Sequence, residues 1–135
     1  MRNGNLVQGW MALAGIVLVA VGVLGFINNP LVGAAPDALV RTNTVHNIVH
    51  LATGLIALYI AFGLRGEAQA NGAIGFGVLY VVIFLALIVS PELFGLFADA
   101  PARPNEHLIH AALAIVSLAV GYMARNRSAT TSAAY

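Results

Sequence analysis

Cysteine and lysine are both missing from this 135-residue chain, and charged residues of every kind make up only 8% of it. Without cysteine there can be no disulfide, no thiolate nucleophile and no thiolate metal ligand. All six basic residues are arginines, and a net charge of +1 does not supply the basic patch that nucleic acid requires. Because a soluble domain carries about a quarter charged residues, the low charge also argues against a soluble protein.

Hydrophobic residues make up 60% of the chain. They form four runs, each near the ~20 residues that a helix needs to cross hydrocarbon. None of these runs has an Asp, Glu or Arg in its central part. We therefore predict an all-α, polytopic protein of the lipid bilayer, with transmembrane helices over about residues 6–27, 45–64, 72–90 and 106–123. These helices would form a single domain over residues 1–127, followed by a disordered tail over residues 128–135.

Polar residues and prolines mark the ends of these predicted helices. Asn43 or Thr44 can cap the second helix, and Pro104 suits the first turn of the fourth. Pro91 stops the third helix. The mixed segment 92–97 that follows is compatible with a stretch lying flat at the membrane interface or with a plain loop.

The arginines predict an orientation. Four of them fall on the side of the two termini and two on the other side: Arg2, Arg65, Arg125 and Arg127 against Arg41 and Arg103. Basic loops stay in the cytoplasm, so we expect both termini to be cytoplasmic.

The second and fourth runs resemble each other when His50 is aligned with His110. Gly54 then matches Ala114, Ala57 matches Ser117, and Ala61 matches Gly121. We interpret this pattern as two repeated helical hairpins related by an axis along the membrane normal. Under this repeat, His50 and His110 lie at similar depth.

All four histidines fall in the first turns of the second and fourth helices. His46 and His50 are spaced i,i+4, and His107 and His110 are spaced i,i+3, so each pair shares a helix face. Small residues continue each face toward the other end of the helix, and small residues let membrane helices approach closely. We therefore predict a seam between the two helices with polar contacts at its end from His50, His110, Asn47, His46 and His107, and with helix packing through Gly54, Ala57, Ala61, Ala114, Ser117 and Gly121.

Three interpretations of the histidines remain open. In the first, His50 and His110 hydrogen-bond across the seam or to Asn47 and fix the register of the helices, without metal or cofactor. In the second, two histidines bind haem b, as in b-type cytochromes. In the third, the four histidines bind zinc or copper, and Asp37, Asp99 or Glu106 joins or orients the ligands.

Enzyme chemistry has little support in the sequence. No triad can be assembled around Ser90 or Ser117, and no acid lies inside a membrane run to relay protons. The glycines Gly72, Gly75 and Gly77 belong to an apolar helix rather than to a phosphate-binding loop. We expect that the protein is not an enzyme and has no catalytic residues.

The segment from Asn43 to Leu51, followed by Gly54, and the later segment from Glu106 to His110 resemble a bacterial family of small four-helix membrane proteins, domain of unknown function 4383. The resemblance covers nearly the whole chain, and its most specific element is the Asn-x-x-His start of the second helix. The family's usual Asn-Pro-x-Asp-Asn-x-x-His element has Arg103, Glu106 and His107 in place of its first Asn, its Asp and its second Asn. The resemblance implies the four-helix fold and a bacterial inner membrane, and it implies no activity.

We expect a structural or accessory role, as a subunit or partner of a larger membrane complex or of other copies of the chain. The alternative is a histidine-ligated haem or metal protein.

Overall fold

The computed structural model describes residues 2–133, and its side chains from residue 6 onward, as four α-helices and a very short two-stranded sheet. The helices are α1 (Arg2–Leu24), α2 (Thr44–Gly63), α3 (Gly66–Val89) and α4 (Pro104–Ser132). The strands β1 (Val32–Gly33) and β2 (Val40–Arg41) pair in parallel within the loop between α1 and α2. Each helix is long and apolar enough to cross a membrane, which confirms the predicted all-α class with four transmembrane helices.

The predicted signals at the helix starts are present. The side chain of Asn43 accepts a hydrogen bond from the backbone N–H of His46 and so caps α2. Pro104 stands in the first turn of α4, where the side chain of Glu106 accepts a hydrogen bond from the backbone N–H of Arg103. The capping places His46, His50 and His110 within two turns of these helix starts.

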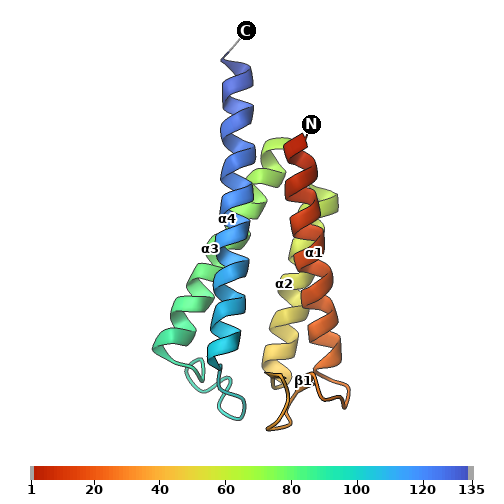
Figure 1. The fold of residues 1–135 in the computed structure, drawn as a ribbon, viewed down its shortest axis with the longest axis vertical. Coiled ribbons are helices and arrows are strands. Elements are labelled where there is room, and N and C mark those ends of the chain that lie inside the picture. Colours follow the sequence, from red (N-terminus) through yellow and green to blue (C-terminus); the bar gives the residue numbers. More distant parts are fainter. Residues whose placement is uncertain (1, 134–135) are drawn as a thin grey trace.

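Helix α4 extends as helix to Ser132, where the sequence predicts a disordered tail from residue 128. The hydroxyls of Ser128, Thr130 and Thr131 each donate to the backbone carbonyl four residues earlier, so they need no partner outside the helix. Figure 1 shows this end of α4 projecting beyond the other helices. Residues 134 and 135 of the predicted tail lie outside the described residues.

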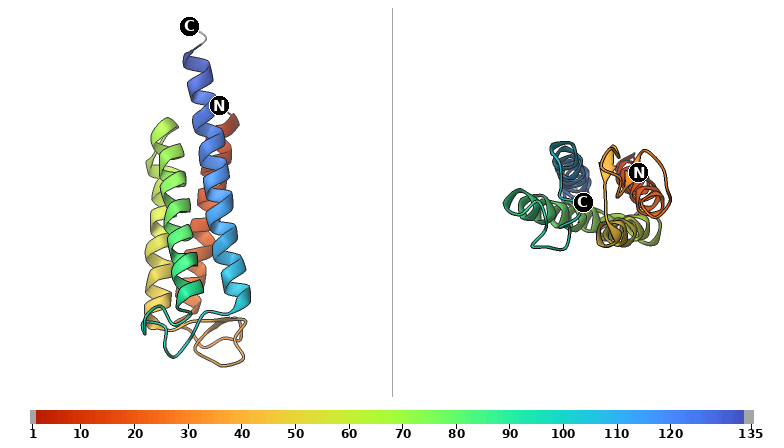
Figure 2. Two further views of the ribbon diagram at one scale, coloured as in Figure 1. Left: turned by 90° about the vertical axis from the view of Figure 1, so that its left-hand side faces the viewer. Right: turned by 90° about the horizontal axis from the view of Figure 1, so that it is seen from below.

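The helices pack mainly as two pairs, α1 with α2 and α3 with α4 (Figure 1). Both termini and the short α2–α3 turn lie at one end of the bundle, and the two long loops lie at the other end (Figures 1 and 2). We call these the terminal end and the loop end. At the loop end the two pairs stand apart in the view of Figure 1, and the histidines lie in this part of the bundle.

Glycines allow the close approach within each pair. A Cβ added to Gly54 of α2 would lie 2.8 Å from the backbone nitrogen of Val19 in α1. In the other pair, a Cβ added to Gly121 of α4 would lie 2.9 Å from the carbonyl oxygen of Ala70 in α3. Such distances leave no room for a side chain, so the small residues bring helix backbones together in lipid.

Each helix pair contains an equivalent close contact between its own two helices. The position of a Cβ on Gly15 of α1 lies 3.0 Å from the carbonyl oxygen of Gly54, and that on Gly77 of α3 lies 3.0 Å from the carbonyl oxygen of Ala114. Gly54 and Ala114 are the residues that the sequence repeat aligns. The contact is consistent with two related hairpins, and the repeat itself stays a prediction.

Polar side chains join the two loops across the loop end. The guanidinium of Arg103 donates to the carbonyls of Pro36 and Ala38, and the amide of Asn105 donates to the carbonyl of Leu39. In the opposite direction, the side chain of Asn43 donates to Asp99 and to the carbonyl of Leu96. The segment 92–97, for which the sequence left two interpretations open, is a series of turns. These bonds hold the 91–103 segment beside the start of α2.

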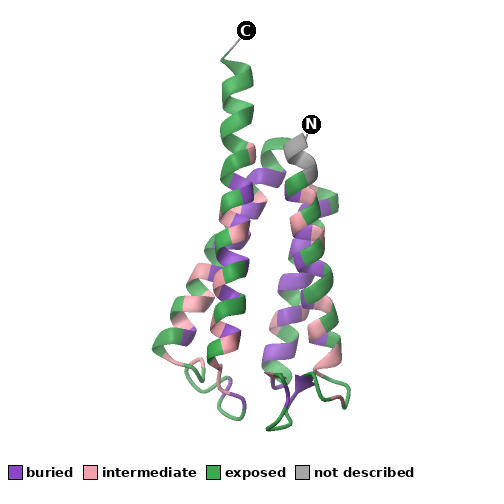
Figure 3. Cartoon of the chain, viewed as in Figure 1, coloured by how far each residue is buried: buried purple, intermediate pink, exposed green. Residues whose placement is uncertain are grey.

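The buried residues form inward stripes on the helices, and the outward faces are apolar and exposed (Figure 3). Leu108 is 72% exposed and Val82 is 58% exposed. A soluble protein would not present such faces to water, whereas lipid tails solvate them.

Candidate functional site

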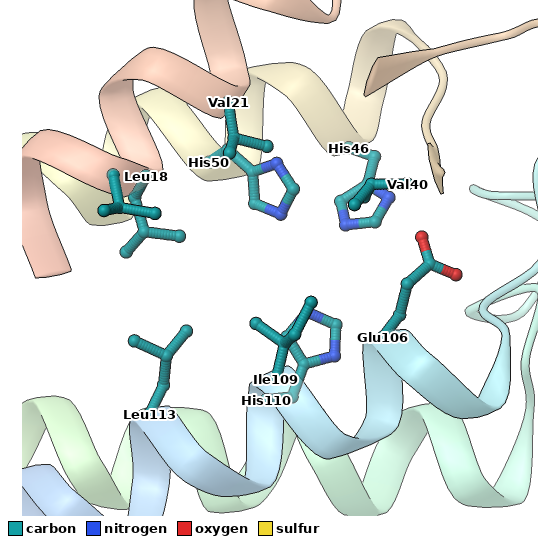
Figure 4. Close-up of a pocket in the computed structure, with 10 residues that line it drawn as sticks. Leu18, Val21, Val40, His46, His50, Glu106, Ile109, His110 and Leu113 are labelled. Atoms are coloured by element: carbon teal, nitrogen blue, oxygen red, sulfur yellow. The ribbon is translucent and has the colours of Figure 1, made fainter. Parts of the chain in front are cut away.

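Three histidines meet between the two helix pairs. The imidazoles of His46, His50 and His110 each offer a nitrogen, and these nitrogens all lie within 4.8 Å of one another. The ring centroids of His46 and His50 are 4.3 Å apart, and those of His46 and His110 are 6.2 Å apart. Figure 4 shows the first two rings reaching from α2 toward the third, which comes from α4. We refer to these residues as the histidine cluster.

The three histidines come together because of the residue spacing along α2 and the position of α4. His46 and His50 are one turn apart on α2, so their rings lie one above the other on the same face. His110 projects from the second turn of α4 toward them. The three rings meet between α2 and α4, where two cavities adjoin them.

The cluster is buried and its nitrogens are incompletely paired. His46, His50 and His110 are 2%, 6% and 4% exposed. The Nδ1 atom of each is buried and has no hydrogen-bond partner among the described residues. A buried polar atom without a partner costs about 1–3 kcal/mol, so three in one place require an explanation such as an ion.

Aromatic side chains enclose the cluster on one side. The ring of Phe97, from the loop after α3, stacks on His46 with centroids 4.4 Å apart and planes 15° apart. Tyr80 of α3 lies 6.0 Å from His110 between ring centroids, and its hydroxyl is 2.9 Å from the hydroxyl of Thr53. These neighbours fix the rings and keep water from this side of the cluster.

Glu106 is the acidic residue beside the cluster. Its Oε2 accepts from the backbone of Arg103, while its Oε1 is buried without a partner among the described residues. Figure 4 shows the carboxylate next to His46. A buried carboxyl group with one unpaired oxygen therefore lines the same cavity as the histidines.

His107 does not join the cluster, contrary to the four-histidine set that the spacing suggested. Its ring meets Phe84 of α3 edge-on, with centroids 6.3 Å apart and planes at 88°. Residues spaced i,i+3 differ by about 60° around a helix, and this angle turns His107 toward α3 while His110 faces α2.

Asn47 also lies away from the predicted contact. Its side chain packs against Gly25 at the end of α1, where an added Cβ would overlap the Asn47 amide. Its Oδ1 is buried without a partner among the described residues. The Nδ1 atoms of His50 and His110 also lack partners among the described residues, so neither Nδ1 makes the hydrogen bond that the sequence suggested between the two rings or with Asn47.

The small-residue stripe packs within the helix pairs and not as one seam between α2 and α4. Gly54 faces Val19 of α1, and Gly121 faces Ile74 of α3. Ser117 accepts a hydrogen bond from the indole of Trp10 in α1 at 2.8 Å. Ala57, Ala61 and Ala114 are buried, as helix packing requires. The expected contact of Gly54 with Ala114 is therefore wrong, because Gly54 packs on α1 and Ala114 lies against Gly77 of α3, each within its own pair.

Two cavities adjoin the cluster. The larger, about 120 Å³, lies between α1 and α4 and is bordered by all three histidines and Glu106. The smaller, about 40 Å³, lies on the side of Tyr80 and Phe97. Sites for drug-sized ligands measure roughly 300–1,000 Å³. The available space suits an ion with a small ligand better than a haem macrocycle.

The aromatic neighbour Phe97 could not be assigned to the site from the sequence. It belongs to the mixed segment 92–97, and nothing in its spacing connects it with His46. The only signal was the proximity of this segment to the start of the fourth helix, and the bonds from Asn43 that bring it to α2 are long-range contacts.

The comparisons with known proteins agree with the resemblance in the sequence. Residues 8–123 match the family described as Domain of unknown function (DUF4383). No curated protein and no solved structure gives a match. The matched segment contains all three residues of the histidine cluster and nearly all of the four helices, so the chain belongs to the DUF4383 family, whose description assigns no activity.

Proposed function

We propose that the protein is a membrane metal-binding protein that holds a transition-metal ion between its two helix pairs through His46, His50 and His110. The observation that carries this proposal is the convergence of three buried imidazoles within 4.8 Å. Imidazole is a common ligand for zinc and copper, with metal–nitrogen distances of about 2.0–2.1 Å for zinc. Ligand atoms on a tetrahedral ion then lie roughly 3.3 Å apart, which the rings reach by small rotations.

An ion would also satisfy groups that the fold leaves unpaired. Each histidine can bind the ion through one ring nitrogen, and Oε1 of Glu106 is free to take a hydrogen bond or balance charge. Metal ligands are usually oriented by such neighbouring groups. Binding, and not catalysis, is the function we propose.

The proposal is tested by metal titration of the full chain in detergent after chelation. We expect one equivalent of Zn²⁺ or Cu⁺ per chain, measured by equilibrium dialysis and elemental analysis. His50→Ala and His110→Ala should lose this binding. His107→Ala is the matched control, because it removes a histidine from the same helix turn but not from the cluster, and it should bind like the parent. Equal binding by His50→Ala, or no binding by the parent, would refute the proposal.

A structural or accessory role in a larger membrane complex is the second candidate. It is favoured by the exposed apolar faces of α3 and α4, which include Val89 at 77% exposure. Lipid alone can also cover these faces, so the test is the size of the particle extracted from the native membrane in mild detergent. A particle that contains other proteins in fixed ratio supports the accessory role, and the single 14.0 kDa chain alone argues against it.

The arginine distribution supports a cytoplasmic position for both termini, which lie at the same end of the bundle (Figure 1). The histidine cluster would then lie near the outer surface of the inner membrane. A reporter fused after Tyr135 should behave as cytoplasmic, and alkaline phosphatase activity from that fusion would reverse the orientation.

A further inference from the structure

The larger cavity beside the histidine cluster has an apolar wall on the side away from the rings. This wall comes from α1 and α4, and its apolar residues are Val17, Leu18, Val21, Ile109 and Leu113. Val40 and Glu106 line the cavity toward the loop end. Figure 4 shows Leu18 and Val21 of α1 facing Ile109 and Leu113 of α4 across an open space that leads to the three imidazoles. The cavity therefore combines an apolar wall with metal-ligating nitrogens at its end.

The rim of this cavity reaches the outer surface of the bundle. Val17 is 50% exposed and Ile109 is 47% exposed, although both line the cavity. Val17 stands seven residues before Leu24 at the end of α1, which is about 10 Å along the helix axis. That depth falls within a hydrocarbon layer about 30 Å thick. The rim therefore faces lipid tails and not water.

Three protein ligands leave a coordination position for a fourth, and the cavity borders the cluster where that ligand can enter. On the opposite side the histidines meet Tyr80 and Phe97, and the space there is only about 40 Å³. An anion or a strongly hydrated molecule would lose its hydration against the leucines and valines of the larger cavity. A small uncharged molecule that dissolves in lipid would not.

The charges around the cluster favour a monovalent ion. Imidazole ligands are neutral, and Glu106 is the acidic residue that lines the cavity. Because the three imidazole ligands are neutral, Cu⁺ would bring one positive charge into this low-dielectric site and Zn²⁺ would bring two, which is more costly. Cu⁺ is also stable with three ligands and binds uncharged diatomic molecules, which Zn²⁺ does not.

From these observations we propose, building on the metal site above, that the cavity between α1 and α4 is the binding pocket for a small, uncharged, lipid-soluble ligand of a copper(I) ion held by the histidine cluster. The ligand enters from the bilayer past Val17 and Ile109. The step is association only: the ligand donates an electron pair to the open position of the metal, and no bond in the ligand breaks.

Carbon monoxide is the probe for this proposal. The full chain in lipid nanodiscs is loaded with Cu⁺ without oxygen, and the C–O stretching band is recorded by infrared spectroscopy. We expect one band that is absent from the metal-free protein. Val17→Trp should fill the rim and weaken carbon monoxide binding roughly tenfold or more, while one copper per chain remains bound. A tenfold change in affinity corresponds to about 1.4 kcal/mol.

Matched controls separate the pocket from general damage. Val23→Trp changes a residue of the same helix that is 45% exposed and does not line the cavity, and it should bind carbon monoxide like the parent. Ile109→Trp tests the rim from α4, with Leu108→Trp as its control, so that one misfolded variant does not decide the result.

The outcomes distinguish this inference from the metal site itself. If neither Cu⁺ nor Zn²⁺ binds, the metal site is refuted and this inference with it. If the metal site binds Zn²⁺ but not Cu⁺, or if copper binds without a carbon monoxide band, only the pocket for an uncharged ligand is refuted. Unchanged carbon monoxide affinity in both rim variants would also overturn this inference, because the ligand would then reach the metal by another route.

Discussion

The polar groups at the two ends of the bundle differ in one respect. Near the terminal end, the side-chain amide of Gln69 donates to the carbonyls of Ile60 and Ala61, and that of Gln8 donates to Ala61. The indole of Trp10 is bonded to Ser117. Near the loop end, the histidine cluster and Glu106 keep buried atoms without partners among the described residues.

This difference separates polar residues that join helices from those available to a ligand. Both sets lie in helices that cross the membrane, where an unpaired polar atom is expensive. Near the terminal end, Gln8, Trp10 and Gln69 each join two helices. The loop end carries this cost at the histidine cluster and Glu106, and also at Asn47 Oδ1 and His107 Nδ1, and functional sites commonly carry such a cost. A bound ion would pair atoms of the histidine cluster and so reduce this difference between the two ends. The following predictions test the difference and the binding of an ion.

The largest effect should come from the metal. A ligand at 1,000 times its dissociation constant stabilises a protein by about 4 kcal/mol. We expect the parent chain to gain stability of this order with Zn²⁺ or Cu⁺ in thermal unfolding in detergent, and His50→Ala to gain none. If both respond alike, the metal acts elsewhere and the cluster is not its site.

A smaller loss of stability should follow from filling the contact between α1 and α2. Gly54→Leu would place a side chain where even a Cβ lies 2.8 Å from the backbone of Val19. Overpacking of this kind costs about 1–3 kcal/mol. Leu55→Ile is the control, because Leu55 is 60% exposed on the outward face and the change conserves volume. Equal unfolding temperatures for the two variants would contradict the packing of α2 on α1.

The position of Gly54 also shows which features of the fold could be predicted from the sequence and which could not. The apolar runs were sufficient for the four helices, because hydrocarbon thickness sets the length of a run, and Asn43, Pro91 and Pro104 mark ends that the structure reproduces within a few residues. The small residues were recognised as packing positions, but their partner was not. A stripe on one helix carries no information on which neighbouring helix it faces. The sequence therefore predicts that Gly54 of α2 packs on α4, whereas it packs on α1.

The site was predictable to a similar extent. The i,i+4 spacing put His46 and His50 on one face, and the alignment of His50 with His110 brought in the third histidine. The 60° offset of His107 depends on how α4 is rotated against α3, which residue spacing cannot supply. Phe97 reaches His46 only through the fold of a loop.

Substitutions in metal-free protein compare the two ends directly. His110→Leu removes a buried group whose Nδ1 has no partner, so we expect little change or a small gain in stability. Gln69→Leu removes donors that are 3.1 and 2.9 Å from two carbonyls, and it should cost about 1 kcal/mol. The measurement is thermal unfolding of both variants in detergent with chelator. A large loss for His110→Leu would mean that the cluster stabilises the fold without metal.

The smallest effect concerns the bond between the two pairs at the terminal end. Trp10 and Ser117 form a side-chain hydrogen bond between α1 and α4. Bonds between membrane helices average about 0.6 kcal/mol in double-mutant cycles, because the unfolded chain in the membrane also finds partners. Trp10→Phe and Ser117→Ala should each destabilise the protein slightly more than this, since both also change packing. Their double variant should then lose less than the sum of the single losses, by about 0.6 kcal/mol.

Additive losses in this cycle would show that the indole and the hydroxyl contribute only through packing. The terminal end would then join its helices through Gln8, Gln69 and the glycine contacts. The contrast with the loop end would rest on fewer bonds, although the histidine cluster would still lack partners. A coupling well above the average would instead mean that this bond helps set how far the two pairs open around the histidines. In that case Trp10→Phe should also weaken metal binding, and the titration used for His50→Ala measures that directly.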